Sequence, residues 1–301
     1  MGSTPSTSPT APVQAWTPLD EARLCLYRVL SLAASDPASR RSARLRAESF
    51  LDQAAAAAAF LAEEPSARPP APAPGELPPA TLGRLPLADF LRRPAAGLTA
   101  EHERVFGLVA SKECPPCETD WCPQTFPIFR SQQLADVAGF YRAFGLEPSR
   151  DRPERHDHVA LELEFMAWLL AKQRHALQAG GPEADERAAV CRDAQRRFVQ
   201  DHLAWWLPAF ALALRRKADG LRDARDLHEP PRSALGALGA ALAAFVAAER
   251  AVLGVDPPVE LAGPRPAEDA DEGGCGGCVA ARAQAEMDST AERAQSGTSL
   301  R

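Results

Sequence analysis

Apolar residues recur at a helical spacing along most of the chain, and capping residues mark where the helices begin. Thr17 and Asp36 are each followed by a proline, the signature of an N-cap before a first-turn proline. The spacing of the apolar residues then predicts helices over 18–35 and 37–64. The N-terminal region is therefore predicted to be a pair of helices.

Seven prolines between residues 65 and 79 exclude a helix there, so this stretch is predicted to be extended, as a loop inside the domain or as a linker. A short helix over 87–92 and a helix capped by Thr99 are predicted to follow. The segment 110–125 contains Cys-Pro-Pro-Cys and is predicted to be irregular.

The helical period returns in the second half of the chain. Helices are predicted from Thr125 to Gly145, from Asp157 as an N-cap to Gly180, over 183–217 and over 235–252. Pro208 predicts a kink near Trp205 and Trp206, because its ring removes a backbone donor and crowds the preceding turn. These two tryptophans are expected to pack in the core and at its rim.

Together the elements predict an all-α protein, a single globular helical domain of about seven to ten helices. No segment has the pattern of a strand, and the low aromatic content of 6% and the scarcity of β-branched residues agree with that. The predicted organisation is a disordered lead over 1–15, a helical domain over 16–255 with a Pro-rich interruption at 65–80, and a flexible tail over 256–301.

The net charge of −6 argues against nucleic-acid binding, which needs a basic surface, and favours a cationic partner. No apolar run approaches the length of a membrane span, so no membrane insertion is expected. The first residues have neither the basic nor the apolar region of an export signal, so the expected location is the cytoplasm.

Two short motifs are the most informative part of the chain. Residues 114–119 read CPPCET and residues 157–166 read DHVALELEFM, with DVAGFYRAFGL between them over 136–146. In these motifs the chain resembles the TorD/DmsD/NarJ-like cytoplasmic chaperones, whose pattern contains Asp-His-x-x-x-Glu-Leu-x-Phe-Met and a Pro-Pro loop. The likeness extends over about 99–212.

The resemblance implies an all-α protein that is not an enzyme and requires no cofactor of its own. It implies a chaperone that binds the apo form of a molybdenum-cofactor oxidoreductase of the DMSO reductase family, and its twin-arginine leader. Such a chaperone assists cofactor insertion and prevents premature export. By position, the resemblance assigns the signal-peptide pair to Asp157 and His158, and the loop that lines the same groove to Pro115, Pro116 and Glu118.

This chain departs from the family's pattern in two places. Cys117 stands where an aromatic residue commonly follows the two prolines, and the region 65–80 is unusually rich in proline. The identity of the partner therefore cannot be carried over from the family.

The side chains are compatible with a peptide that carries two arginines followed by an apolar stretch, because carboxylates bind guanidinium groups bidentately and apolar segments lie in grooves between helices. The acidic candidates are Glu118, Asp157, Glu162 and Glu164. The aromatic candidates are Trp121, Phe126, Phe129, Phe140 and Tyr141.

Structural roles compete with these assignments. Asp157 can be an N-cap, and Glu162 and Glu164 can be solvated helix surface. His158 can be an exposed or packed histidine without a role in binding. The sequence leaves these alternatives open.

The cysteines suggest a second kind of chemistry. Two Cys-x-x-Cys pairs are present, with a fifth cysteine in reserve: Cys114, Cys117, Cys275, Cys278 and Cys122. Such pairs have the spacing that zinc or an iron–sulfur cluster requires of thiolates. A zinc or iron–sulfur protein with a redox or regulatory role is therefore the alternative function, while a dithiol switch and inert thiols also remain open. No phosphate-binding loop or nucleophile motif of an enzyme is present.

Overall fold

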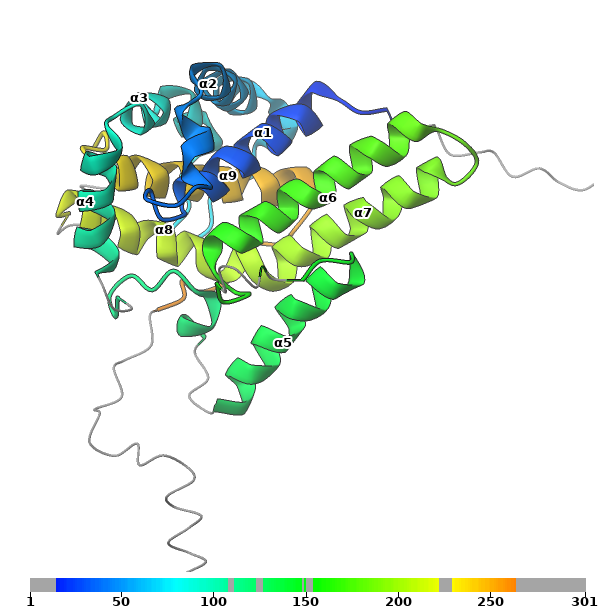
Figure 1. The fold of residues 1–301 in the computed structure, drawn as a ribbon. Coiled ribbons are helices and arrows are strands. Elements are labelled where there is room, and N and C mark those ends of the chain that lie inside the picture. Colours follow the sequence, from blue (N-terminus) through cyan, green and yellow to red (C-terminus); the bar gives the residue numbers. More distant parts are fainter. Residues whose placement is uncertain are drawn as a thin grey trace, which may run out of the picture. The chain divides into compact units, whose positions relative to one another are not determined.

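A computed structural model describes residues 15–107, 111–122, 127–147, 149, 154–221 and 229–263. These residues belong to one compact unit and contain nine α-helices and no strand, which confirms the predicted all-α fold class (Figure 1). The helices are α1 Pro18–Ala33, α2 Glu48–Glu63, α3 Leu87–Leu91, α4 Ala95–Phe106, α5 Pro127–Ala143, α6 Val159–Ala179, α7 Ala184–Phe198, α8 Ala204–Asp219 and α9 Ala234–Leu253. The predicted lead and tail lie outside the described residues except at their inner edges.

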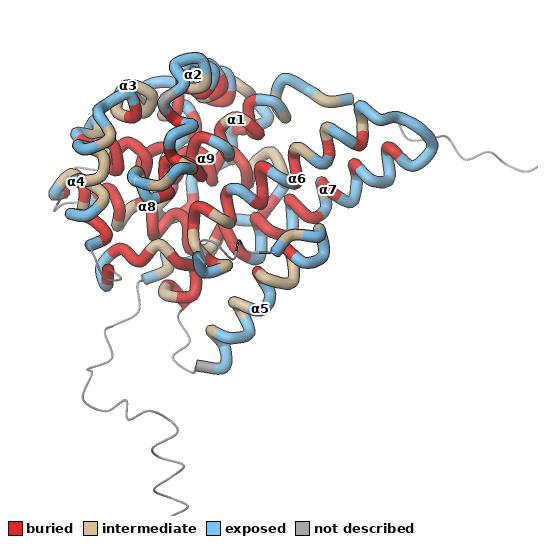
Figure 2. Tube along the Cα trace, in the orientation of Figure 1, coloured by how far each residue is buried: buried red, intermediate tan, exposed pale blue. Residues whose placement is uncertain are grey.

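Helix α9 forms the centre of the core and is buried from Ala234 to Arg250 (Figure 2). It packs closely on α8, because a Cβ atom added at Gly239 would stand 2.7 Å from the carbonyl oxygen of Ala211. Within the described residues α9 alone is long and apolar enough to cross a membrane, but 89% of that stretch is buried inside the domain. A helix that is apolar on all sides is the expected composition for a core position.

The N-terminal helix begins as predicted, whereas the second begins later. Thr17 caps α1, since its Oγ1 accepts from the backbone N–H of Asp20 at 3.1 Å. The prediction that Asp36 opens a long helix was wrong, because α2 starts only at Glu48. Asp36 instead begins a turn, in which its Oδ1 accepts a hydrogen bond from the N–H of Ala38 at 2.8 Å.

The Pro-rich stretch is a loop inside the domain. Leu77 donates its N–H to the carbonyl of Ala243 in α9, and the buried carboxylate of Glu76 binds the buried guanidinium of Arg250 at 2.6 and 2.7 Å. Short 3₁₀ turns at Pro65–Ala67 and Pro79–Arg84 flank it. The chain here is therefore fixed to the core helix rather than serving as a linker.

Two other helix boundaries differ from the predictions. Helix α4 begins at Ala95, after Pro94, so that Thr99 lies inside the helix and does not cap it. The predicted long helix over 183–217 is divided by a π-helical turn at Val199–Leu203, one turn before the expected kink. Pro208 lies inside α8 and cannot donate a backbone hydrogen bond to the turn before it, so the ladder is already irregular at this point.

Candidate functional site

The loop 111–122 and the segment before α6 are joined by backbone hydrogen bonds. Glu118 donates its N–H to the carbonyl of Asp157 at 2.9 Å, and Val159 donates to the carbonyl of Pro116 at 2.8 Å. Cys117 and His158 form an isolated antiparallel β-bridge between these bonds. The two motifs of the sequence analysis therefore meet at one place in the fold.

Trp121 anchors the loop to the core. Its Nε1 donates to the carbonyl of Pro115 at 2.9 Å, and its ring lies 6.5 Å from that of Trp206 and 6.4 Å from that of Phe210. The side chain is buried, so Trp121 holds the Pro-Pro loop in place. Trp206 is also buried, as expected for a core tryptophan.

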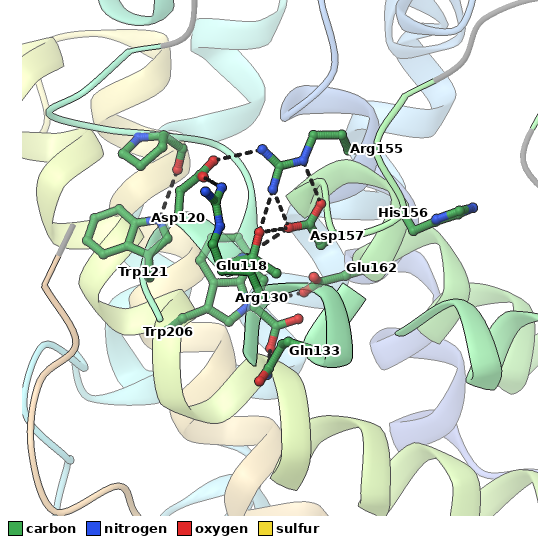
Figure 3. A network of polar contacts seen from close by, with 12 residues as sticks. Glu118, Asp120, Trp121, Arg130, Gln133, Arg155, His156, Asp157, Glu162 and Trp206 are labelled. Atoms are coloured by element: carbon green, nitrogen blue, oxygen red, sulfur yellow. Dashed lines mark hydrogen bonds and ion pairs between the residues drawn. The ribbon is translucent and has the colours of Figure 1, made fainter. Parts of the chain in front are cut away.

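Asp157 is the buried partner of the loop and of an arginine (Figure 3). Its Oδ2 accepts from the N–H and the hydroxyl of Thr119 at 3.0 and 2.8 Å. Arg155 binds both carboxylate oxygens, through Nε at 3.0 Å and Nη2 at 2.8 Å. The N-cap alternative for Asp157 was wrong, because His158 caps α6 by accepting from the N–H of Ala160 at 3.2 Å.

Asp120 lies between two arginines (Figure 3). Its Oδ2 accepts from Nη1 of Arg155 at 3.1 Å, and its Oδ1 accepts from Nη2 of Arg130 in α5 at 2.7 Å. The guanidinium group of Arg155 therefore bridges two aspartates, Asp120 and Asp157. The sequence motifs had predicted no role for Arg130, Arg155 or Asp120.

Glu118 connects the loop to α5 and to the beginning of α8. It is fully buried, and its Oε1 accepts from Nε2 of Gln133 and from Nε1 of Trp205, both at 2.9 Å. Nδ1 of His202, which is also buried, lies 3.2 Å from both carboxylate oxygens. Glu118 is thus a hub of internal hydrogen bonds.

Glu162 is buried beneath this hub. Its Oε2 accepts from Nε1 of Trp206 at 3.2 Å, whereas its Oε1 has no hydrogen-bond partner among the described residues. Burial raises its pKa well above 4.5, and the nearby charges of Glu118 and Asp157 raise the pKa further. Burial therefore favours the protonated form of Glu162, and its alternative as solvated surface was wrong.

Two aromatic rings and one acid beside the site differ in exposure. Tyr141 is buried and donates its hydroxyl to the carbonyl of His156 at 2.8 Å. Phe140 packs edge-on against Phe165 and Phe198. Glu164 is exposed and pairs with Arg41 at 2.6 Å, as the solvated alternative predicts.

An open pocket of 470 Å³ lies beside the joined motifs, between α6, the end of α5 and the turn after α1. Its apolar wall includes Tyr141, Leu161, Phe165 and Trp168, and its acidic members are Glu147, Glu154 and Glu164. Trp168 is 41% exposed, which is unusual for so large an apolar side chain. Of the other predicted aromatic candidates, Phe129 is exposed on α5 and Phe126 lies outside the described residues.

Burial disfavours a charged imidazole at His158. Desolvation lowers the pKa of His158 below 6.5, although Glu154 and Asp157 oppose the shift. His158 is therefore held mostly neutral at pH 7, where its Nδ1 can accept the capping hydrogen bond.

The cysteines of the loop 111–122 are buried, and burial disfavours the thiolate form of two of them. Cys114, Cys117 and Cys122 are all buried. Burial raises the pKa of Cys114 to about 12 and raises that of Cys117 as well. Metals bind the thiolate, so these environments fit a metal site poorly as they stand. Within the ranges that the structure describes no group of three or more candidate ligands is placed to hold a metal, and Cys275 and Cys278 lie outside those ranges.

Several residues of the site were not predicted. Asp120, Arg130, Gln133, Arg155 and His202 all belong to the polar network around Glu118 and Asp157. A usable signal was the density of charged residues directly beside the motifs, since Asp120 follows Glu118 by two positions and Arg155 precedes Asp157 by two. Helix α5 offered a second signal, because Arg130 and Gln133 are spaced to share one face.

The fold and the joined motifs define the class: an all-helical protein whose signature residues fix two chain segments against each other beside an open pocket. Residues 79–212 match the family model described as "Nitrate reductase delta subunit". The predicted resemblance to the TorD/DmsD/NarJ-like chaperones is thereby confirmed over this range, which contains both motifs.

Curated proteins similar to this chain are chaperones by name. The selenate reductase assembly chaperone of Thauera selenatis is 37% identical over 125 residues, which are 42% of this chain and 55% of that protein. The perchlorate reductase assembly chaperone of Dechloromonas aromatica is 41% identical over 76 residues, 25% of this chain and 31% of that protein. The TorD chaperone of Vibrio cholerae is 33% identical over 81 residues, 27% of this chain and 33% of that protein. The chain thus spans about half the length of these relatives, or less.

Proposed function

We propose that the protein is an assembly chaperone for the catalytic subunit of a molybdenum-cofactor reductase. The observation that carries the proposal is the family match over 79–212, because this range contains the joined motifs and most of the pocket beside them. The protein binds the apo-enzyme until the cofactor is inserted. It acts in the cytoplasm as a binding protein and not as an enzyme.

The pocket supports binding of a leader peptide with two arginines and an apolar stretch. Its carboxylates Glu147 and Glu154 supply negative charge for guanidinium groups, and Glu164, which pairs with Arg41 of the same pocket, already shows this kind of contact. Trp168 and Phe165 supply apolar surface for the stretch that follows. In this proposal the buried Asp157 and Glu118 shape the site, and the exposed carboxylates make the first contacts.

Purification of the tagged chain from its native cells tests the proposal. We expect the catalytic subunit of a reductase to co-purify, in its apo form and with its leader uncleaved. Trp168→Ala should reduce the recovered subunit several-fold, because it removes exposed apolar surface from the pocket. Phe60→Ala is the matched control, since Phe60 is 38% exposed on α2 and does not line the pocket.

Two results would contradict the proposal. The first is the absence of any reductase subunit from the purified material under conditions in which the cells make the enzyme. The second is recovery of only the mature, cofactor-loaded enzyme, which would indicate binding after assembly. If Phe60→Ala reduced the recovered subunit as much as Trp168→Ala does, the pocket would not be the binding site for the subunit.

A further inference from the structure

Two arginines of this chain already occupy the carboxylates of the candidate site. Arg155 binds Asp157 in a bidentate manner, at 3.0 and 2.8 Å, and reaches Asp120 at 3.1 Å. Arg130, from the separate element α5, binds the other oxygen of Asp120 at 2.7 Å. Figure 3 shows both guanidinium groups converging on this acidic pair.

The acidic pair and its occupants differ in burial. The side chain of Asp157 is 0% exposed, whereas those of Arg130 and Arg155 are 35% and 44% exposed. The Arg130–Asp120 pair lies where water reaches both side chains, at 35% and 23% exposure, and such pairs contribute about 1 kcal/mol or less, so Arg130 can leave at low cost. The buried carboxylate of Asp157 cannot remain unpaired, and therefore Arg155 can leave only when another cation replaces it.

A second observation shows that the network under α5 is not fully satisfied. Oε1 of Glu162 is buried without a hydrogen-bond partner among the described residues, and Nε2 of His202 is buried with the carboxylate of Asp136 3.7 Å away, beyond hydrogen-bond distance. Both side chains are almost completely buried. Buried polar atoms are rarely left in this state unless another arrangement pairs them.

Helix α5 itself is weakly embedded at its beginning. No side chain from Ile128 to Asp136 is buried (Figure 2), and Ile128 is 70% exposed. Over this part the polar contacts of α5 with the body include Arg130 to Asp120, Gln133 to Glu118 and Asp136 to His202. Arg130 is thus carried by a segment that polar groups, rather than apolar packing, hold against the acidic pair.

We propose that Arg130 and Arg155 are an internal occupant of the acidic pair Asp120 and Asp157, which the two arginines of a client leader displace. The proposal rests on the proposed function, in that it takes a leader with paired arginines as the client. Two guanidinium groups leave the aspartates and two enter, so that charge is conserved. Only molecules in which Arg130 and Arg155 have left the aspartates can bind the leader, so the apparent affinity for the leader falls in proportion to the fraction of such molecules.

The direct test is the affinity of Arg130→Ala for a peptide with two arginines followed by an apolar stretch, measured by calorimetry. The variant should bind the peptide about two- to five-fold more tightly than the unaltered chain, the range that a partly exposed ion pair supports. Arg142→Ala is the matched control, because Arg142 is exposed on the same helix away from the acidic pair. Its affinity should not change, and the gain of Arg130→Ala should be smaller for a peptide with two lysines.

A second variant tests the acidic pair without any peptide. Arg155→Ala leaves Asp157 unpaired, and millimolar ethylguanidinium should raise its melting temperature more than ethylammonium does. The unaltered chain should respond equally to both compounds. If Arg155→Ala does not fold, the Arg130→Ala measurement alone decides.

The outcomes separate this proposal from the proposed function. Equal or weaker peptide binding by Arg130→Ala overturns the internal occupant, while co-purification of a reductase subunit would still support the chaperone function. No binding of the peptide by any variant also overturns the internal occupant. Absence of the reductase subunit from the purified chain is the result that counts against the chaperone function itself.

Discussion

Replacing Asp157 by asparagine tests the structural role of the site most sharply. The carboxylate accepts four hydrogen bonds, two from Thr119 and two from Arg155. An asparagine oxygen in the place of Oδ2 can keep the bonds from Thr119 and accept a weaker, uncharged one from Nη2 of Arg155, but an amide nitrogen in the place of Oδ1 cannot accept from Nε of Arg155. Since Asp157 is fully buried, the loss leaves polar groups without partners inside the protein.

The expected cost of Asp157→Asn is about 2–3 kcal/mol. Each hydrogen bond to a charged group contributes about 1.5–3 kcal/mol, and the two from Arg155 are discounted because its side chain is 44% exposed. For a domain of this size 1 kcal/mol corresponds to roughly 2–4 °C, so the melting temperature should fall by about 5–10 °C.

Thermal unfolding by circular dichroism measures the effect, with Asp52→Asn as the control. Asp52 forms an exposed ion pair with Arg92, and its loss should cost less than about 1 kcal/mol. The double variant Asp157→Asn/Arg155→Gln should be less destabilised than the sum of its two single variants. A change for Asp157→Asn no larger than the control, or strict additivity in the double variant, would refute the reasoning.

Three further predictions concern other parts of the molecule. The folded pKa of Glu162 lies above 4.5, so its contribution to stability is complete below pH 4.5 and is lost as pH rises toward the folded pKa. In denaturant unfolding between pH 4.5 and 8, the free energy of unfolding of Glu162→Gln should therefore decline less than that of the unaltered chain, whereas Glu164→Gln should decline as the unaltered chain does. In thermal unfolding, Gly239→Ala should lose about 1–3 kcal/mol of stability because its Cβ would overlap α8. Gly139→Ala, whose Cβ would have nothing within 4 Å, should gain about 0.5–1 kcal/mol of stability, and equal effects of the two variants would contradict the packing of α8 on α9. A metal site formed by Cys114, Cys117, Cys275 and Cys278 would hold about one equivalent of zinc, or one iron–sulfur cluster, that the double variant Cys275→Ser/Cys278→Ser loses. Because burial raises the pKa of Cys114 and Cys117, we expect elemental analysis of anaerobically purified protein to find no metal bound by these two residues.

Helix boundaries were predictable where the capping contact is local. The capping box of Thr17 lies within three residues of sequence, and its pattern located the start of α1 correctly. Asp157 is also of a type that favours the N-cap position and lies just before a helix, yet its carboxylate accepts from Thr119, 38 residues earlier. A competition between a local and a distant partner is decided by tertiary structure, which the order of residues along the chain does not display.

The position of the site was predictable, but the burial of its acids was not. The motifs around Glu118 and Asp157 were expected to lie together, and backbone hydrogen bonds join them. Their carboxylates were expected to face a peptide, whereas they face Gln133, Trp205 and Arg155 inside the protein. Acids usually lie on the surface, so only the structure could identify these as an internal network.

The most direct test of the chaperone function is the molybdenum content of the client's catalytic subunit in cells that lack this protein. We predict a subunit that is made but contains little molybdenum and has little activity, and that regains both when the unaltered chain is supplied. Trp168→Ala should restore them less well than Phe60→Ala. A catalytic subunit with its full molybdenum content and activity in the absence of this protein would contradict the account.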